Sequence, residues 1–273
     1  WIKNHANRCQ GLSNFLVDSY RFVIPAFSIT NGVCYLKFDE ASGAIINKWS
    51  TGDGIGSAGN FSTTGVTYGV TGIIDDAVSC DGTNDFMVSP SATKTDFGFI
   101  HALNQAWSIN LWFKKANANR GGIDALLANR VGGDVGIRLK ELDRSGEGET
   151  RKLQLEIDSG SAGSAVAMYD SDVNEFFPND TGWHMLTIAA DNSITTNAMQ
   201  IYLDGELDHN VNRVGVGDNG TPEYPMNLAQ EGDDTDFGDY TFDETSFWKR
   251  KLSSDDVSQL YNDGDALALT ETT

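Results

Sequence analysis

Apolar and polar residues alternate along most of the chain from Gly32 onward, and a period of two is typical of half-buried β-strands. The alternation is strict in KLQLEI at 152–157, while WSINLWF at 107–113 alternates large apolar residues with small or polar ones. Turn sequences separate the strands, such as the Asp-Gly pair at 204–205. About a dozen strands with almost no helical pattern predict an all-β protein built as a two-sheet antiparallel β-sandwich.

Two local patterns add detail to this architecture. The turn Asp-Gly-Thr-Asn at 81–84 lies between the strand-like runs 77–80 and 85–88, which predicts a hairpin. The period changes at Leu252–Tyr261, where Ser253 or its neighbour can cap a helix and two aspartates follow in the first turn. We therefore expect one short C-terminal helix.

The organisation of the chain follows from where the strand pattern begins and ends. Residues 1–31 mix asparagine, arginine and scattered aromatics without a clear period, which predicts an N-terminal arm or irregular segment. Residues 32–265 carry the strand pattern and the helix, and form the expected domain. Residues 266–273 remain as a C-terminal tail.

The balance of acidic and basic residues excludes some classes of binding partner. The 273 residues include 39 acids and 19 bases, for a net charge of −20. This excess argues against nonspecific nucleic-acid binding and against anionic membrane surfaces, because both need Lys and Arg. No apolar run reaches the roughly 18 residues of a membrane span, so we expect no membrane insertion. High acidity suits a saline medium or divalent cations.

Three cysteines cannot form a full disulfide framework. Cys34 and Cys80 both lie in strand-like runs, so we expect buried free thiols rather than a bridge. The first ten residues are polar and do not predict a signal peptide.

Several segments, which follow one another along the chain in the same order as in the family, resemble the laminin-G-like, concanavalin-A-like jelly rolls. YLKFDEASG resembles their opening strand and turn, SCDGTNDFMVSP resembles a hairpin motif of the family, and FDETSFWKRKLSSDDVSQLYNDG resembles the closing strand and helix. WSINLWFK, GWHMLTIAAD and MQIYLDGEL resemble its core strands. The likeness covers about residues 32–265 and implies a jelly roll of two curved sheets. Members of this family serve as glycan-binding modules, adhesion modules, accessory domains of secreted enzymes and parts of virus particles, so the fold alone does not fix the function.

The resemblance also implies a structural Ca²⁺ at one edge of the sandwich, held by carboxylates and backbone carbonyls. The matching positions hold Asp39, Asp81 and Asp243, with Glu40 and Glu244 beside two of them. Ca²⁺ takes six to eight oxygen ligands, often from loops. The alternative is that these acids only cap turns or form surface pairs.

A second acidic segment runs from Asp218 to Asp239 and includes the sequence GDDTDFGD. It resembles a cation-binding loop but lacks the spacing of an EF-hand. Crowded carboxylates repel one another unless cations or solvent intervene. We favour a solvated loop over a cation site here.

Aromatic residues in loop-like stretches are candidates for stacking against a sugar. The candidates are Trp49, Tyr68, Tyr169 and Tyr224. The tryptophans at 107, 112, 183 and 248 are expected in the core. Packing within the protein is the alternative for each candidate.

A catalytic role lacks a credible set of residues. Related glucanases carry paired carboxylates on one strand, and a retaining mechanism needs them about 5–5.5 Å apart. The run Glu141–Glu147 comes near this pattern, but its second glutamate is one residue too far along. Surface ion pairs with Arg144 and Arg151 are the favoured interpretation, so no enzyme activity and no catalytic residue are expected.

Two functions remain open. The first is a non-catalytic structural or adhesion protein, such as a phage capsid decoration, a tail protein or a surface component. In it, residues 1–30 would contact neighbouring subunits and the jelly roll would bind a glycan or a surface protein. The second is a Ca²⁺-dependent glycan-binding lectin module of a secreted or cell-surface protein. Both place the chain outside the cell or on a virion surface.

Overall fold

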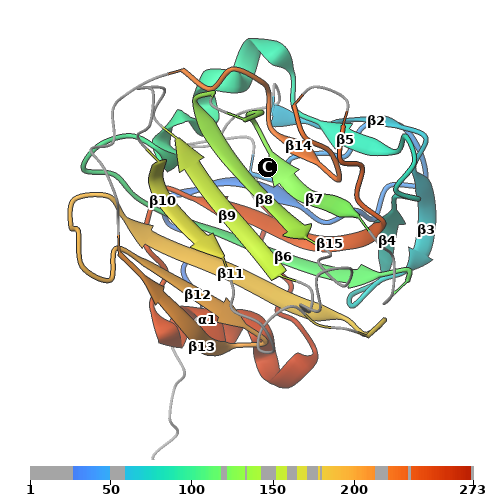
Figure 1. Ribbon diagram of the computed structural model, residues 1–273. Coiled ribbons are helices and arrows are strands. Elements are labelled where there is room, and N and C mark those ends of the chain that lie inside the picture. The colour runs from blue at the N-terminus through green and yellow to red at the C-terminus, as the bar shows by residue number, and fades with distance from the viewer. Residues whose placement is uncertain are drawn as a thin grey trace, which may run out of the picture.

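The computed structural model describes residues 27–49, 59–117, 122–132, 134–142, 152–158, 165–170, 178, 180–212, 221–232 and 235–271. Its strands form two antiparallel sheets that pack face to face, as the sequence predicts (Figure 1). Within these ranges, no helix is long and apolar enough to cross a membrane.

The larger sheet has eight strands in the order β13-β12-β11-β6-β15-β4-β3, and β1 pairs with β15 beside this path. Its strands are β1 (Gly32–Leu36), β3 (Thr67–Thr71), β4 (Asp76–Ser79), β6 (Ala106–Lys115), β11 (His184–Asp191), β12 (Met199–Leu203), β13 (Glu206–Val211) and β15 (Tyr240–Trp248).

The smaller sheet has seven strands in the order β10-β9-β8-β7-β14-β5-β2. Its strands are β2 (Ser62–Thr64), β5 (Phe86–Val88), β7 (Ile123–Ala128), β8 (Gly136–Leu142), β9 (Lys152–Asp158), β10 (Ala165–Asp170) and β14 (Asn227–Leu228). Besides the strands there are a 3₁₀ helix η2 (Ser91–Ile100), the helix α1 (Ser254–Tyr261) and a short 3₁₀ turn η4 (Asn262–Gly264).

The main core lies between the two sheets and follows from the alternation of the sequence. In β6, the side chains of Trp107, Ile109, Leu111 and Phe113 all belong to this core. Leu153, Leu155 and Ile157 of β9 reach it from the other sheet, and η2 adds Phe97 and Ile100. Cys34 and Cys80 are also buried here as free thiols, as predicted, whereas Cys9 lies outside the described residues.

The predicted hairpin around the turn 81–84 is wrong. β4 belongs to the larger sheet and β5 to the smaller one, so this turn carries the chain from one sheet to the other. Cys80 donates its backbone N–H to Tyr240 in β15, at 2.9 Å, rather than to a residue of β5. A turn signal between two alternating runs shows a change of direction but not which neighbour each strand will find.

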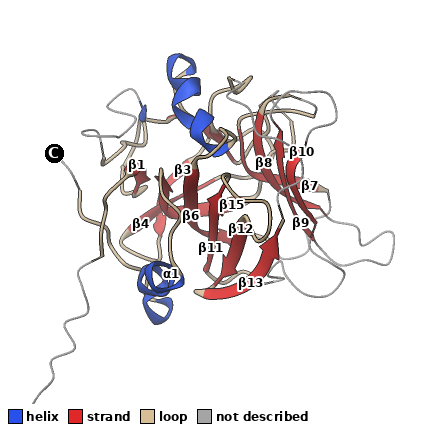
Figure 2. Ribbon diagram, turned by 90° about the vertical axis from the view of Figure 1, so that its left-hand side faces the viewer, coloured by secondary structure: helices blue, strands red, loops and turns tan. Residues whose placement is uncertain are grey.

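A second core covers the outer face of the larger sheet, the face turned away from β7–β10 (Figure 2). Trp112 and Trp248 point to this side and pack with Val257 and Leu260 of α1. Ser253 caps the helix, since its hydroxyl accepts from the Asp256 backbone while Asp256 accepts from the Ser253 backbone. The predicted C-terminal helix is therefore confirmed, and it converts an exposed sheet face into a buried one.

The chain segments at both ends of the domain join this second core. Phe27 packs edge-on against Trp248, and the Arg250 guanidinium binds the Ser28 carbonyl at 2.8 Å. At the other end, the Ala266 and Leu269 side chains are buried, although the sequence places them in a tail. Gly32 lies so close to the Trp49 ring that a Cβ there would meet it at 2.5 Å.

His184 links the start of β11 to the turn between β12 and β13. Its Nδ1 lies 2.8 Å from Asp204 and its Nε2 lies 3.0 Å from Asp180. Burial opposes protonation, but the two aspartates prevail and raise the pKa of His184 above its ordinary value. The protonated imidazolium can donate to both carboxylates at once.

We predict that the domain loses stability as pH rises through the folded-state pKa of His184. A raised pKa means that the folded state binds more protons than the unfolded state, so this contribution is complete below pH 6.5, the ordinary value, and fades above it. Melting temperatures between about pH 5.5 and 8.5 test this. His184→Gln should flatten the slope in this window, whereas His209→Gln on the exposed strand β13 should not. An unchanged slope in His184→Gln would refute the assignment.

Candidate functional site

Asp243 lies where β15 changes partner, from β4 to β1. Its Oδ2 accepts the backbone N–H groups of Ile73 and Ile74, at 2.8 and 3.1 Å, and its Oδ1 accepts that of Glu244, at 2.9 Å. Burial raises the pKa of Asp243 to about 8, and these amides oppose the shift. The carboxyl group thus holds the turn between β3 and β4 onto the central strand.

Glu244 is buried beside Asp243 and has a backbone φ of 44°, within a bulge of β15. The Tyr35 hydroxyl donates to its Oε2. Its Oε1 is buried without a hydrogen-bond partner among the described residues. Burial raises the pKa of Glu244 to about 7, although the bond from Tyr35 and the charge of Lys37 lower it. An unsatisfied buried carboxylate oxygen is costly, and a bound water or cation would satisfy it.

The structure brings only part of the predicted metal set together. Asp39 pairs with Lys37 at 2.9 Å and accepts from the Asp76 backbone, so it lies at the same end of β4 as Glu244. Asp81 lies at the opposite end of β4, where it accepts from the Thr83 backbone at 2.8 Å. No three His, Cys, Asp or Glu side chains group as a metal site in the described part of the chain. Calcium binding stays a prediction.

The four predicted sugar-binding aromatics lie in different places. Trp49 is almost fully buried against Trp248, with its Nε1 donating to the Thr270 carbonyl, so it offers no ring face to a sugar. Tyr68 is half-buried, and its hydroxyl donates to the Gly43 carbonyl. Tyr169 lies in β10 opposite Leu155, and its side chain is outside the described structure.

Tyr224 packs against the loop that carries Glu231, a member of the group of charged side chains described below. It is half-buried, and its ring packs directly on Gly232, where a Cβ would meet it at 2.4 Å. Its backbone N–H donates to the Asn129 carbonyl at the end of β7, at 3.2 Å. Both contacts place Tyr224 against residues next to charged ones in the chain, since Gly232 follows Glu231 and Asn129 precedes Arg130.

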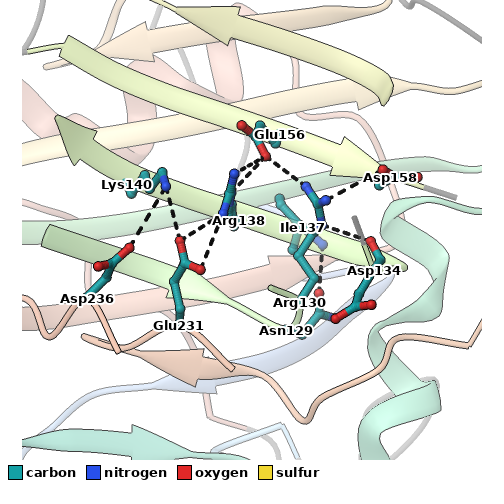
Figure 3. Close-up of polar contacts among 10 residues, drawn as sticks. All are labelled: Asn129, Arg130, Asp134, Ile137, Arg138, Lys140, Glu156, Asp158, Glu231 and Asp236. Carbon is teal, nitrogen blue, oxygen red and sulfur yellow. Dashed lines mark hydrogen bonds and ion pairs between the residues drawn. The ribbon is translucent and has the colours of Figure 1, made fainter. Parts of the chain in front are cut away.

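This cluster, which we call the charge ladder, crosses the outer face of the smaller sheet (Figure 3). Glu156 Oε2 accepts Arg138 and Arg130, with closest distances of 2.6 and 2.9 Å. Arg138 also reaches Glu231, at 3.2 Å, and Glu231 binds Lys140 at 3.2 Å. Its members are Arg130, Arg138, Lys140, Glu156, Asp158, Glu231 and Asp236. Acids and bases alternate, so each base is held by at least one carboxylate.

Strand alternation explains why these charges share one face. In β8, Ile137 and Leu139 point into the core, so Arg138 and Lys140 point outward. In the register of the sheet Arg138 stands opposite Glu156. The alternation of the two strands predicts that Arg138 and Glu156 share a face, but the sequence does not give the register that places them opposite each other.

The other half of the ladder comes from a loop. Glu231 is 4% exposed, so this part of the acidic segment is not the solvated loop that we expected. Backbone bonds fix the segment, including Ala125 N–H to the Asp236 carbonyl at 2.9 Å. Burial and the charge of Glu231 raise the pKa of Asp236, while Lys140 and Arg138 oppose this. Residues 213–220, 233 and 234 lie outside the described structure.

Glu141, the first acid of the glucanase-like run, does not lie on this face. Glu141 is 1% exposed, and its carboxylate binds Lys115 and the Tyr240 hydroxyl, both at 2.7 Å. Glu141 thus forms a buried ion pair with Lys115 at the edge of the core. Residues 143–150 of the run lie outside the described residues.

Solved structures share this fold at low sequence identity. The receptor binding domain of botulinum neurotoxin C/D mosaic serotype has a TM-score of 0.59 at 12% identity, covering 86% of this chain and 51% of that one. A botulinum neurotoxin type C structure gives 0.54 at 11%, covering 86% and 53%. Trypanosoma rangeli sialidase gives 0.58 at 12%, covering 89% and 34%. The chain thus spans about half the length of these toxin domains and a third of the sialidase.

No curated protein matches the chain in sequence. A family model does match it over residues 81–258, well over half of its length and within the region that resembles jelly rolls. The two antiparallel sheets and the closing helix agree with that match. The chain belongs to the concanavalin A-like lectin/glucanases superfamily.

Proposed function

We propose that the chain is a non-catalytic binding module that recognises a glycan through the outer face of its smaller sheet. The observation that carries this proposal is the charge ladder on that face (Figure 3), together with the half-buried ring of Tyr224, which packs on Gly232, the residue after the ladder's Glu231. Sugars are bound by aromatic faces together with fixed polar groups. The mutual ion pairs fix the ladder before a ligand arrives, which lowers the entropy cost of binding.

The comparisons support a binding role. The C/D mosaic neurotoxin structure is a receptor binding domain, and cell entry of botulinum neurotoxin type C depends on interaction with two ganglioside molecules. A glycan or a surface protein as partner, and a location outside the cell or on a virion surface, fit this role. The sialidase shares the fold at 12% identity, which says nothing of catalysis here.

The geometry around the carboxylates supports the absence of hydrolase activity. Glu231 and Asp236 interact directly, and Lys140 lies within 3.9 Å of both. A retaining glycosidase needs its two carboxyl groups about 5–5.5 Å apart with the sugar between them. Glu141 is committed to Lys115. These carboxylates therefore suit a fixed binding surface.

A second proposal concerns assembly. Residues 27–32 dock onto the second core through Phe27 and the Ser28 carbonyl, at the outer face of the larger sheet. This face is opposite the charge ladder (Figure 2). An arm there can hold a neighbouring subunit of a virion or surface assembly while the ladder stays available to a glycan.

Calcium is proposed as a structural ion at Glu244 and Asp39. The orphaned Glu244 Oε1, with Asp39 nearby, fits a cation that prefers oxygen ligands. Asp243 would support the site by holding the turn, and Asp81 lies apart from it. Bound Ca²⁺ would neutralise this buried negative charge.

We expect a glycan array to show binding that depends on Tyr224. Tyr224→Ala removes the ring beside the ladder and should lower affinity about tenfold. Tyr68→Phe, which removes only the hydroxyl that binds Gly43, should bind like the parent chain. Melting curves check that both variants fold. Equal binding by Tyr224→Ala and the parent would place the glycan elsewhere.

We expect removal of residues 1–26 to abolish higher-order assembly and to leave the melting temperature nearly unchanged. The deletion spares Phe27 and Ser28, which contact the domain. Sedimentation of the full and shortened chains with their native assembly partners measures the effect. Normal assembly of the shortened chain would contradict the arm proposal.

We expect Ca²⁺ to raise the melting temperature relative to EDTA, because an ion that binds only the folded state stabilises it. Glu244→Gln should abolish the Ca²⁺ effect, and Asp243→Ala should lower the melting temperature more in Ca²⁺ than in EDTA. Asp81→Asn should keep the full effect. A Ca²⁺ shift that survives in Glu244→Gln would move the ion away from this site.

A further inference from the structure

We propose that the charge ladder selects neutral, hydroxyl-rich glycans and rejects sialylated or sulfated ones. This inference rests on the proposed function, since it names the class of ligand for the same face. It sets this chain apart from botulinum neurotoxin type C, since gangliosides carry sialic acid. It follows from how the charges of the ladder are arranged, rather than from how many bases it contains.

No base of the ladder is left to recognise an anion. Arg138 uses its guanidinium on Glu156 and Glu231, while Arg130 binds Glu156 and lies 3.5 Å from Asp158. Lys140 is held between Glu231 and Asp236. A carboxylate or sulfate ligand would have to displace one of these acids, which are themselves fixed to the strands and the loop.

The ladder carries more acid than base. Its three bases face four carboxylates, within a chain whose net charge is −20. An anion placed on this face therefore meets repulsion at short range from the ladder and at long range from the rest of the chain. A neutral sugar meets neither.

The ladder still offers acceptors to hydroxyl groups. Glu156 receives both arginines on Oε2, so its second oxygen, Oε1, takes no part in the ladder (Figure 3). The Asp236 side chain is the most exposed of the ladder, at 28%. Carboxylate oxygens accept strong hydrogen bonds from sugar hydroxyls. These two carboxylates therefore suit the hydroxyl groups of a polyol.

The test compares the chain on an array that pairs neutral oligosaccharides with sialylated and sulfated forms of the same cores. We expect binding to the neutral members, weakened when the acidic group is added. Binding should change little between about 0.05 and 0.5 M salt, because no net ion pairing is involved. A preference for the acidic forms would overturn this inference and leave the proposed function intact. No glycan binding at all would overturn both.

Two variants assign the selectivity to the ladder. Glu156→Gln should weaken binding of a neutral ligand about tenfold by calorimetry, since it removes a charged acceptor. Asp236→Asn keeps the shape of the loop and should raise the ratio of acidic to neutral binding several-fold. Glu206→Gln, a matched change on the exposed strand β13, should alter neither. If Asp236→Asn folds and keeps the parent ratio, charge in the ladder does not set the selectivity.

Discussion

Both faces of the larger sheet are covered, and the rest of the structure depends on this constraint. All nine residues of β15 are buried, because the smaller sheet packs on one side and α1 with the two end segments packs on the other. Its outward residues are accordingly aromatic or small and polar, as in Ser246 and Trp248. Asp243 is tolerated in this strand because three backbone amides donate to its carboxylate, whereas Oε1 of the neighbouring Glu244 has no hydrogen-bond partner among the described residues.

The smaller sheet differs from the larger one, because its inner face is apolar and its outer face is charged. The inner face belongs to the core, and the outer face holds the candidate site. Its inner face supplies Leu153, Leu155 and Ile157 to the core, whereas its outer face carries arginine, lysine and glutamate. Burying such charges costs free energy unless they are paired with good geometry. The ladder meets this cost by alternating acid and base across β8, β9 and the loop around Glu231. A rigid polar face results.

Much of the fold could be predicted from the sequence because it depends on local period. The alternation of 107–113 and 152–157 marks strands with one face in the core, and the capping serine marks the start of α1. Sheet membership could not be predicted, and the turn 81–84 shows why. Two alternating runs joined by a turn look the same whether they pair with each other or with strands far away in the chain.

The candidate site was harder to predict from the sequence, because it too depends on contacts between residues far apart in the chain. Loop position predicts exposure for Trp49, yet the C-terminal segment packs there and its Thr270 carbonyl accepts a hydrogen bond from the Trp49 Nε1–H. The ladder joins residues up to 93 positions apart, from Arg138 to Glu231, and no spacing rule connects them. Acidity of the segment 218–239 indicates solvation when the segment is taken alone. In the folded chain, however, Arg138 and Lys140 of β8 form ion pairs with Glu231 and hold it on the sheet. The negative charge that predicts an exposed loop therefore fixes the position of this loop.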